Sequence, residues 1–247
     1  MDQKQPKFVF ALDTSDIMSA IRAIEAFKGY GIGFKIGQKL IAALLTASKD
    51  QVLDLIAYIK KSGNFVFFDP KYGDTLDQIG GATELIANHG VDLISVHTSA
   101  GQDMMRGAIE KAGGSDRIIG ITVLTSIGDA ECKVIFGDER AIVVPRLVNH
   151  GLEAGVLNFV MSAKEVEAMR PVVGDGKILV AGLKLKGGQA NRGQKAVGTF
   201  EDAAQFADFL VTGMPWTRWK EGGFSSPQAA LEAILAEIAE GAQRRAS

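Results

Sequence analysis

The amino-acid sequence predicts an α/β protein built as a (β/α)8 TIM barrel. Eight short apolar runs follow one another at fairly even intervals, and the segments between them carry apolar residues at helical spacing. The runs are nearly continuous in apolar residues, as expected for strands that are buried on both faces of a parallel sheet. Eight such units in 247 residues fit one closed barrel, so we expect a single domain over residues 1–247. A doubly wound open sheet is the alternative.

The elements can be placed in chain order. The strands are predicted at residues 8–12, 32–36, 65–69, 92–97, 117–124, 156–161, 177–182 and 208–213. No glycine-rich phosphate-binding fingerprint follows the first strand, which disfavours a dinucleotide-binding open sheet. The first helical segment places Ile17, Ile21, Ile24 and Phe27 on one face. The last segment, residues 226–239, begins with Ser-Pro and is predicted to be an amphipathic helix that closes the ring.

Composition excludes several classes of partner and function. The formal net charge is -2 with both signs interspersed, so we expect no surface for nucleic acid or for an anionic membrane. The one cysteine, Cys132, has no internal partner for a disulfide and does not make a thiolate metal site by itself. The apolar run before Asp13 is too short for a signal peptide, and no run approaches transmembrane length. We therefore expect a cytoplasmic protein.

Polar side chains gather where the predicted strands end. In a barrel of this class the carboxyl ends of the strands meet at one rim, and catalytic groups lie there. Five successive strands deliver polar groups to this rim. These groups are Asp13 after the first strand, Lys35 within the second, Asp69, Lys71 and Asp74 at the third, His97 at the fourth, and Thr125 and Ser126 after the fifth. Random solvation of strand ends would rarely produce this set, so we predict a functional charge network.

Lys35 is the most informative member of this network. It stands inside the apolar run IGFKI, where an unpaired ammonium group would be costly to bury. Asp13 and Asp69, on the neighbouring strands, are the nearest candidates for its carboxylate partners. A lone Asp-x-Lys-x-x-Asp motif at a strand end is more often solvated surface, and the buried lysine is what favours the functional interpretation.

Six segments of the chain carry a family resemblance. In order, they read FALDTSD, FKIGQKL, FFDPKYGDT, ISVHTSAG, ITVLTSI and FLVTGMPWT. They resemble the successive strand ends of the orotidine 5'-phosphate decarboxylase family, in its bacterial branch, from about residue 8 to residue 231. The Asp-x-Lys-x-x-Asp motif alone marks the wider suprafamily, which includes hexulose 6-phosphate synthase and 3-keto-L-gulonate 6-phosphate decarboxylase. Those magnesium enzymes carry a glutamate where this chain has Lys35, so the resemblance implies no metal and no other cofactor.

The resemblance implies a function as well as a fold. It implies metal-independent decarboxylation of orotidine 5'-phosphate to UMP in pyrimidine biosynthesis, by a homodimer with shared active sites. In this reading Lys71 is the cation and acid placed against C6 of the pyrimidine, and Asp69 presses on the departing carboxylate. Asp74 is contributed across the dimer interface, while Lys35 and Asp13 hold the array and contact the ribose hydroxyls.

The resemblance also implies contacts with the rest of the substrate. Ser126 is expected to hydrogen-bond the pyrimidine, with His97 and Thr125 nearby. The family grips the phosphate with an arginine after strand 7, a glutamine in the following loop, and an arginine after the glycine of strand 8. The matching residues here are Lys184, Gln194 and, after Gly213, Met214.

The phosphate end is where the chain departs from the family. Lys184 keeps a positive charge but loses the bidentate fork of a guanidinium group, and Met214 has no donor at all. Four other cations are possible substitutes, namely Lys186, Arg192, Lys195 and Arg218. A further change puts Gln78 where the family has a threonine. Two alternatives therefore stay open: a family member that acts on a different phosphorylated or carboxylate substrate, and a weakly active or non-catalytic nucleotide-binding barrel.

Overall fold

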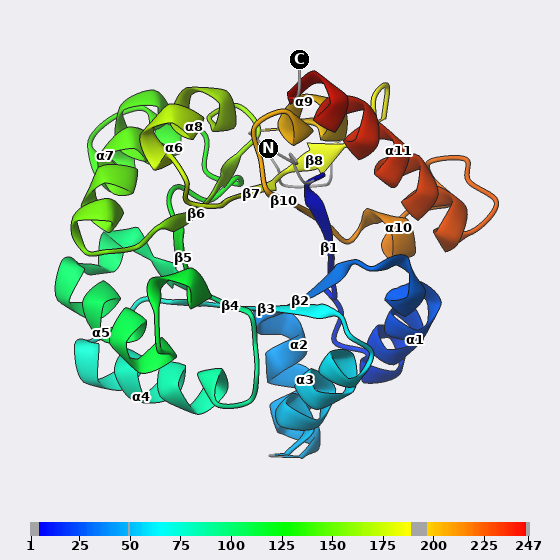
Figure 1. Ribbon diagram of the computed structural model, residues 1–247, viewed down its shortest axis with the longest axis horizontal. Helices are drawn as coiled ribbons and strands as arrows, with labels where there is room; N and C mark the ends of the chain where they lie inside the picture. Colours follow the sequence, from blue (N-terminus) through cyan, green and yellow to red (C-terminus); the bar gives the residue numbers. More distant parts are fainter. Residues whose placement is uncertain (1–4, 49, 189–196, 246–247) are drawn as a thin grey trace.

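Eight parallel strands close into a barrel that is surrounded by helices in the computed structural model of the chain (Figure 1). The structure describes residues 5–48, 50–188 and 197–245. Around the ring the strands follow the order β1-β10-β7-β6-β5-β4-β3-β2. They are β1 (Lys7–Ala11), β2 (Gly33–Gly37), β3 (Phe65–Tyr72), β4 (Leu93–His97), β5 (Ile118–Ile121), β6 (Asn158–Ser162), β7 (Ile178–Ala181) and β10 (Phe209–Thr212). The predicted barrel is confirmed, and the open sheet is excluded because β1 pairs with both β2 and β10.

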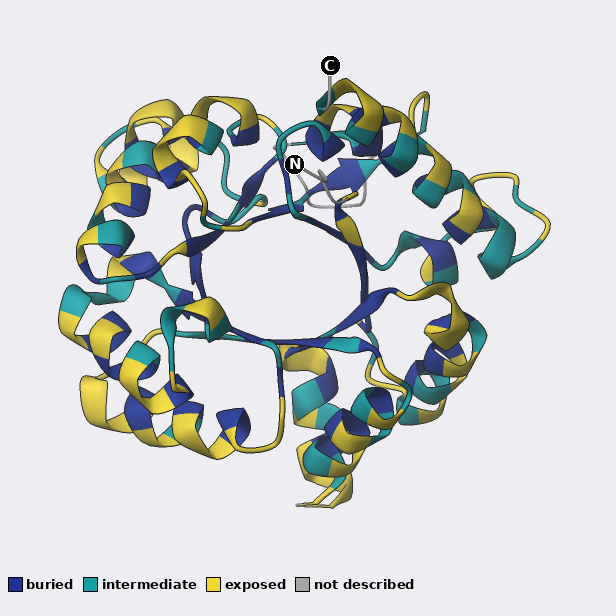
Figure 2. Ribbon diagram, in the orientation of Figure 1, coloured by how far each residue is buried: buried dark blue, intermediate teal, exposed yellow. Residues whose placement is uncertain are grey.

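Helices line the outside of the barrel with their buried faces toward the strands (Figure 2). The longer ones are α1 (Ile17–Phe27), α2 (Gln38–Ala47), α3 (Gln51–Lys61), α4 (Leu76–Ala87), α5 (Gln102–Ala112), α6 (Asp129–Phe136), α7 (Arg140–Glu153), α8 (Val166–Val173) and α11 (Pro227–Arg245). Shorter ones are α9 (Phe200–Ala204), α10 (Met214–Thr217), η1 (Lys28–Tyr30), η2 (Thr98–Ala100) and η3 (Ser115–Arg117). Side-chain caps begin some of them: the Asp16 carboxylate accepts a hydrogen bond from the Ser19 amide at the start of α1, and the Thr199 hydroxyl accepts one from the Asp202 amide at the start of α9. No described helix is long and apolar enough to cross a membrane.

Several boundaries differ from the prediction. The fifth strand ends at Ile121, so that Val123 and Leu124 belong to the loop that follows it. The third strand continues to Tyr72, and the last helix extends to Arg245 instead of ending at residue 239. A second, two-stranded sheet, which was not predicted, pairs β8 (Leu183–Lys184) with β9 (Gly198–Thr199).

The interior of the barrel is apolar toward the amino ends of the strands and polar at their carboxyl ends. Inward-facing side chains form one cluster of buried residues, namely Val9, Ala11, Phe67, Leu93, Ile119, Leu179, Phe209 and Val211. Phe65 stacks on Phe209 below them, with 5.1 Å between the ring centres. Side chains alternate between the two faces of a strand, so the next inward positions on β2, β3 and β4 are Lys35, Asp69 and Ser95. The polar groups therefore lie directly above the apolar cluster, at the carboxyl ends of the strands.

Candidate active site

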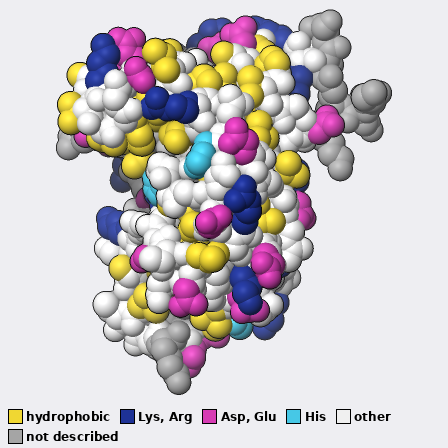
Figure 3. Space-filling view, turned by 90° about the vertical axis from the view of Figure 1, so that its left-hand side faces the viewer, with side chains coloured by type: hydrophobic (Ala, Val, Ile, Leu, Met, Phe, Trp, Pro, Cys, Tyr) yellow, Lys and Arg dark blue, Asp and Glu magenta, His cyan; other side chains and the backbone are white. Residues whose placement is uncertain are grey.

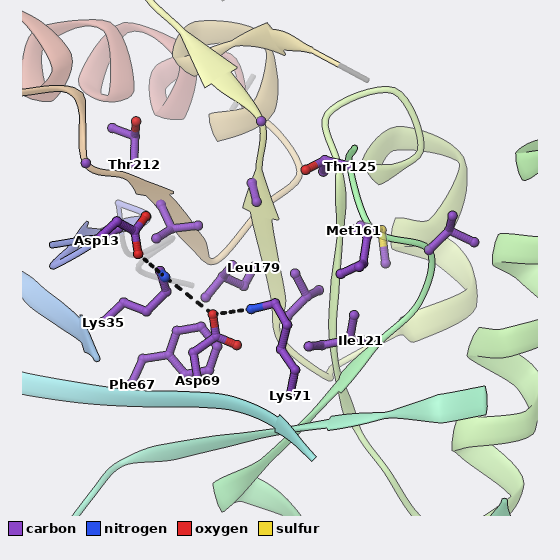
Figure 4. A pocket seen from close by; sticks show the side chains of 18 residues that line it. Asp13, Lys35, Phe67, Asp69, Lys71, Ile121, Thr125, Met161, Leu179 and Thr212 are labelled. Carbon is purple, nitrogen blue, oxygen red and sulfur yellow. Dashed lines mark hydrogen bonds and ion pairs between the residues drawn. The ribbon is translucent and has the colours of Figure 1, made fainter. Parts of the chain in front are cut away.

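Four charged side chains form a row of alternating charge at the carboxyl end of the barrel (Figure 4). Asp13 follows β1, Lys35 lies on β2, and Asp69 and Lys71 lie on β3. Lys35 Nζ is 2.8 Å from Asp13 Oδ1 and 3.4 Å from Asp69 Oδ2. Lys71 Nζ is 2.5 Å from the same Asp69 oxygen. Lys35 thus has the two partners that the sequence predicts, and one oxygen of Asp69 faces both ammonium groups.

Lys35 keeps its charge despite its depth. Its side chain is only 12% exposed, and burial by itself would lower the pKa of Lys35 because it removes water from the ammonium group. The attraction of Asp69 and Asp13 outweighs burial and raises the pKa of Lys35 above its ordinary value. The group is therefore protonated at neutral pH and holds both carboxylates by charge and by hydrogen bonds.

Gly37, at the end of β2, leaves room for this row. A Cβ atom at this position would lie 2.9 Å from Lys35 Nζ and 3.3 Å from Asp13 Oδ1. Both separations are shorter than an ordinary van der Waals contact. Any larger residue at position 37 would push the ammonium group away from its carboxylate.

Lys71 has an unusual backbone conformation. Its φ angle is 55°, and it is the one non-glycine residue in the described part of the chain with a positive φ. Such a conformation costs about 1–3 kcal/mol and is found mainly at functional sites. The pairing register between β3 and β4 also shifts between Phe68 and Tyr72, which marks a bulge. Bulges next to active sites redirect side chains, and here Asp69 and Lys71 both reach the mouth of the barrel.

A cavity of about 220 Å³ lies beside the row of charges. Its polar walls come from Asp13, Lys35, Asp69 and Lys71 on one side and from Thr125 on the other. The remaining walls are mostly apolar, including Phe67, Ile121, Val123, Leu124, Val160, Met161, Leu179, Ala181 and Val211, with Gly182, Thr212 and Gly213 at the end nearest β7 and β10. An apolar cavity with one edge of fixed charges can stabilise a developing negative charge with little competition from water.

Three of the site residues that are not expected at the phosphate end lie outside this cavity. Asp74 is exposed in the segment between β3 and α4, where its carboxylate accepts a hydrogen bond from the Thr75 amide. Ser126 is exposed in the loop after β5, next to the cavity-lining Thr125. His97 is half-buried at the end of β4, and burial followed by the charge of Lys71 lowers the pKa of His97 below its ordinary value.

Two of the residues predicted at the phosphate end line a second cavity of about 450 Å³. Lys184 and Met214 both lie in its wall, together with Arg218. Gly182 and Gly213 line the first cavity, and the residues that follow them line the second, so the two cavities adjoin. The guanidinium group of Arg218 forms an ion pair with Glu221 at 2.6 Å.

The other polar residues expected near a phosphate do not line the second cavity or lie outside the described residues. Lys186 Nζ lies 3.2 Å from Glu201, and its side chain is largely exposed. Gln194, Arg192 and Lys195 lie outside the described residues. Of the four possible substitutes for the missing arginine, Arg218 is the one that the structure places in the wall of the second cavity.

Two groups near the site were not predicted from the sequence. Ser95 on β4 is fully buried and hydrogen-bonded to Asp69, and the signal was available because it is a polar residue inside the apolar run DLISVH, as Lys35 is in its own run. Arg140 on α7 is also buried and pairs with Glu165 at 2.7 Å. Arg140 is on a helix, so the search for polar residues at the ends of strands did not find it.

The row of charges contains two carboxylates and two ammonium groups. Within residues 5–48, 50–188 and 197–245, no group of three or more His, Cys, Asp and Glu side chains is arranged to hold a metal ion. Cys132 is buried in α6 and is a free thiol.

Comparison with known proteins agrees with this geometry. The model of the orotidine 5'-phosphate decarboxylase / HUMPS family matches residues 6–220. The orotidine 5'-phosphate decarboxylase of Ehrlichia canis is 32% identical over 93% of this chain and 96% of its own length. The protein of the same name from Syntrophus aciditrophicus is 31% identical over 97% of this chain and 95% of its own length.

Solved structures share the fold. The crystal structure of orotidine 5'-phosphate decarboxylase from Lactobacillus acidophilus matches 95% of this chain and 99% of its own with a TM-score of 0.74 and 22% identity. An uncharacterized conserved protein from Geobacillus kaustophilus matches 94% of this chain and 99% of its own with a TM-score of 0.73 and 23% identity. The family match covers the strand ends that carry the row of charges, the whole of the first cavity and most of the second. The chain belongs to the orotidine 5'-phosphate decarboxylase / HUMPS family.

Proposed function

We propose that the protein decarboxylates orotidine 5'-phosphate to UMP, without a metal ion, in pyrimidine biosynthesis. The observation that carries the proposal is the pair of Lys71 and Asp69 at the edge of an apolar cavity, in a chain that matches this family along most of its length. This substrate is favoured over another carboxylate, because relatives named orotidine 5'-phosphate decarboxylase match nearly the whole chain.

Decarboxylation requires a cation and a proton donor close to C6 of the pyrimidine. When the bond from C6 to the carboxylate breaks, its electron pair stays on C6, and no adjacent carbonyl delocalises the charge. The Lys71 ammonium group then stabilises the carbanion and gives a proton to C6, and CO₂ leaves. Asp69 lies beside the departing carboxylate, where repulsion between like charges in the ground state favours the release of CO₂. Lys71 regains its proton from solvent before the next turnover.

The two cavities suggest how the nucleotide lies. The pyrimidine fits the cavity beside Lys71, with Thr125 and Ser126 on its far side, and the ribose hydroxyls contact Asp13 and Lys35. The phosphate then reaches the second cavity past Gly213, where Lys184 and Arg218 supply positive charge.

The protein is further proposed to be a one-domain, cytoplasmic homodimer. Asp74 supports this because it is exposed and does not line the cavity of its own subunit. A carboxylate in that position is available to a neighbouring subunit. The family resemblance implies that this carboxylate completes the active site of the partner subunit.

Substitution of Lys71 tests the proposal. The Lys71→Ala variant should remain folded and lose at least about a hundred-fold in kcat on orotidine 5'-phosphate, since general acid catalysis alone is worth about 10²–10⁴-fold. Lys60→Ala is the matched control, because Lys60 pairs with Asp92 at 2.8 Å away from both cavities, and it should keep parental activity.

Two further results would decide against the proposal. A parent enzyme with no measurable decarboxylation of orotidine 5'-phosphate would favour the different-substrate or non-catalytic alternative. Activity that is lost on exhaustive chelation and restored by magnesium would place the chain with the magnesium enzymes of the suprafamily. We expect full activity after chelation.

A further inference from the structure

Ser95 is a buried hydroxyl that contacts both members of the Lys71–Asp69 pair. It lies on β4, faces the barrel interior above Leu93, and has no solvent exposure. Its Oγ donates a hydrogen bond to Asp69 Oδ1 at 2.8 Å and accepts one from the Lys71 backbone N–H at 2.9 Å. The hydroxyl has one proton, which it donates in the hydrogen bond to Asp69. A lone pair of the same oxygen therefore accepts the hydrogen bond from the Lys71 amide.

This hydroxyl stands where the regular pairing of β3 with β4 is interrupted. Phe68 pairs with Ile94 and Tyr72 pairs with Val96, so three residues of β3 lie opposite Ser95 alone. Pro70, in the middle of the three, has no N–H to give to the sheet. The Ser95 side chain therefore satisfies the Lys71 N–H in place of a backbone carbonyl.

The same contact sets the orientation of the Asp69 carboxylate. Asp69 is 4% exposed, and its Oδ1 is directed to Ser95. Its Oδ2 is then left to face Lys71 at 2.5 Å and Lys35 at 3.4 Å. Rotation of the carboxylate would break the hydrogen bond to Ser95 and move Oδ2 away from both ammonium groups. The backbone of Lys71, with its φ of 55°, is held at the same point.

We propose that Ser95 is a positioning residue, whose buried hydroxyl fixes the Lys71 backbone and the Asp69 carboxylate in the geometry needed for decarboxylation. This inference rests on the proposed function. Ser95 does not line the cavity, so it acts through the two residues that do. Its loss should therefore affect the chemical step more than nucleotide binding.

The Ser95→Ala variant tests the inference. It leaves a buried carboxylate oxygen and a backbone N–H without their partner, and loss of a hydrogen bond to a charged group corresponds to roughly a ten- to hundred-fold decrease in kcat. KM and the Kd for UMP should change by no more than about twofold, because the ribose and phosphate contacts are untouched.

Two further variants separate positioning from simple loss of a buried hydroxyl. Thr98→Val is the matched control, since Thr98 is equally buried and its hydroxyl donates to the Ile121 carbonyl, away from the charged row. This control should lose stability comparable to that lost by Ser95→Ala and keep parental kcat. Ser95→Thr retains the hydroxyl and should recover most of the activity that Ser95→Ala loses.

The outcomes are distinct. A Ser95→Ala variant with parental kcat overturns the inference, and so does a Ser95→Thr variant that makes both hydrogen bonds in its crystal structure yet is no more active than Ser95→Ala. An inactive parent overturns the proposed function instead. In that case the crystal structure of Ser95→Ala decides the geometric claim: a rotated Asp69 or an altered Lys71 backbone supports it, and an unchanged site overturns it.

Discussion

A buried ammonium group requires partners, and Lys35 shows how the barrel provides them. Its neighbours Asp13 and Asp69 come from strands on either side, and each contributes one carboxylate oxygen within 3.4 Å. Removal of one partner of a buried ion pair leaves an uncompensated charge and typically costs about 3–5 kcal/mol, so the three residues act as a unit. Because Asp69 also binds Lys71, a change at any point of the row is passed to the proposed acid.

His97 predicts a pH dependence of stability. Burial, and then the charge of Lys71, lower the pKa of His97 below its ordinary value of 6.5, with Asp69 acting in the opposite direction. The unfolded chain therefore binds this proton more readily, so the free energy of unfolding should fall as the pH drops through about 6.5 and should be unaffected by His97 above it. Urea unfolding of the parent and of His97→Asn between pH 5 and 8 should show a shallower decline for the variant. His89→Asn, which replaces an exposed histidine, is the control. An equal decline in parent and His97→Asn would show that His97 does not contribute.

Met214 predicts weak phosphate binding that can be repaired. The second cavity has Lys184 and Arg218 in its wall, but Arg218 is shared with Glu221 and Met214 offers no donor. KM for orotidine 5'-phosphate should therefore be high and should rise further with salt. Met214→Arg should increase kcat/KM by roughly ten- to a hundred-fold, the equivalent of about 1.5–3 kcal/mol for one charged hydrogen-bonded contact.

A matched leucine variant separates charge from shape at this position. Met214→Leu keeps an apolar side chain of similar volume, and its kcat/KM should stay near the parental value. If Met214→Arg gives no gain over an active parent, the phosphate is already held by other groups, and our account of the second cavity is wrong.

At the scale of single elements, the sequence predicted the eight strands well because strands buried on both faces leave a nearly continuous apolar run. The same rule extended the fifth strand too far. Val123 and Leu124 are apolar because one packs in the core and both line the cavity, and apolarity alone does not distinguish these roles from strand pairing. The bulge in β3 was not predicted, although Pro70, directly after the predicted third strand, is a sequence signal for it because proline has no N–H to give to a sheet. The hydrogen bond from the Lys71 amide to Ser95 of the neighbouring strand could be seen only in the fold.

The site was predictable to a similar extent. The row of charges could be predicted because parallel strands bring their ends together, and the partners of Lys35 followed from its burial. The placement of Ser126 outside the cavity could not be predicted, since it lies on a loop whose path depends on tertiary packing, whereas the resemblance already assigned Asp74 to the site of a partner subunit. Contacts between neighbouring helical segments, such as that of Arg140 with Glu165, likewise require the fold.

The loop between β5 and α6 depends on one arginine. Arg140 donates to the carbonyl groups of Val123, Leu124 and Ile127, and its guanidinium group pairs with Glu165, which directly precedes α8. This brace holds the loop that carries Thr125 and Ser126 over the cavity.

Arg140→Met should therefore be strongly destabilising. It leaves the buried Glu165 unpaired, which corresponds to a loss of about 3–5 kcal/mol in the free energy of unfolding. KM should also rise, because the loop carries residues proposed to contact the pyrimidine. Arg146→Met on the same helix is the control, since Arg146 pairs with Asp138 on the surface and such pairs contribute only about 0–1 kcal/mol. Urea unfolding and steady-state kinetics measure both effects, and a loss no larger than that of the control would contradict the role of Arg140 as a brace.

At the scale of the whole molecule, the proposed dimer requires a surface through which two subunits can associate. The side of the barrel that carries α4, α5, α6 and α7 shows hydrophobic side chains between charged ones (Figure 3). Large exposed hydrophobic residues on these elements are Leu76, Leu85, Val134, Ile135 and Ile142. Leu76 begins α4 two residues after Asp74, so a contact made by this end of α4 would bring Asp74 close to a neighbouring subunit.

Mixed dimers test whether Asp74 serves the partner subunit. Lys71→Ala and Asp74→Ala should each give a dimer with strongly reduced activity, because every site then lacks one group. If Asp74 acts across the interface, a mixed dimer has one site with both groups intact and one with neither. An equal mixture refolded together should then recover about a quarter of the parental activity, because random pairing of two subunits makes about half of the dimers mixed. If Asp74 acts within its own subunit, the mixture contains no intact site and recovers nothing. Light scattering on the mixture measures whether dimers form at all, and a monomeric parent that is fully active would refute the shared site.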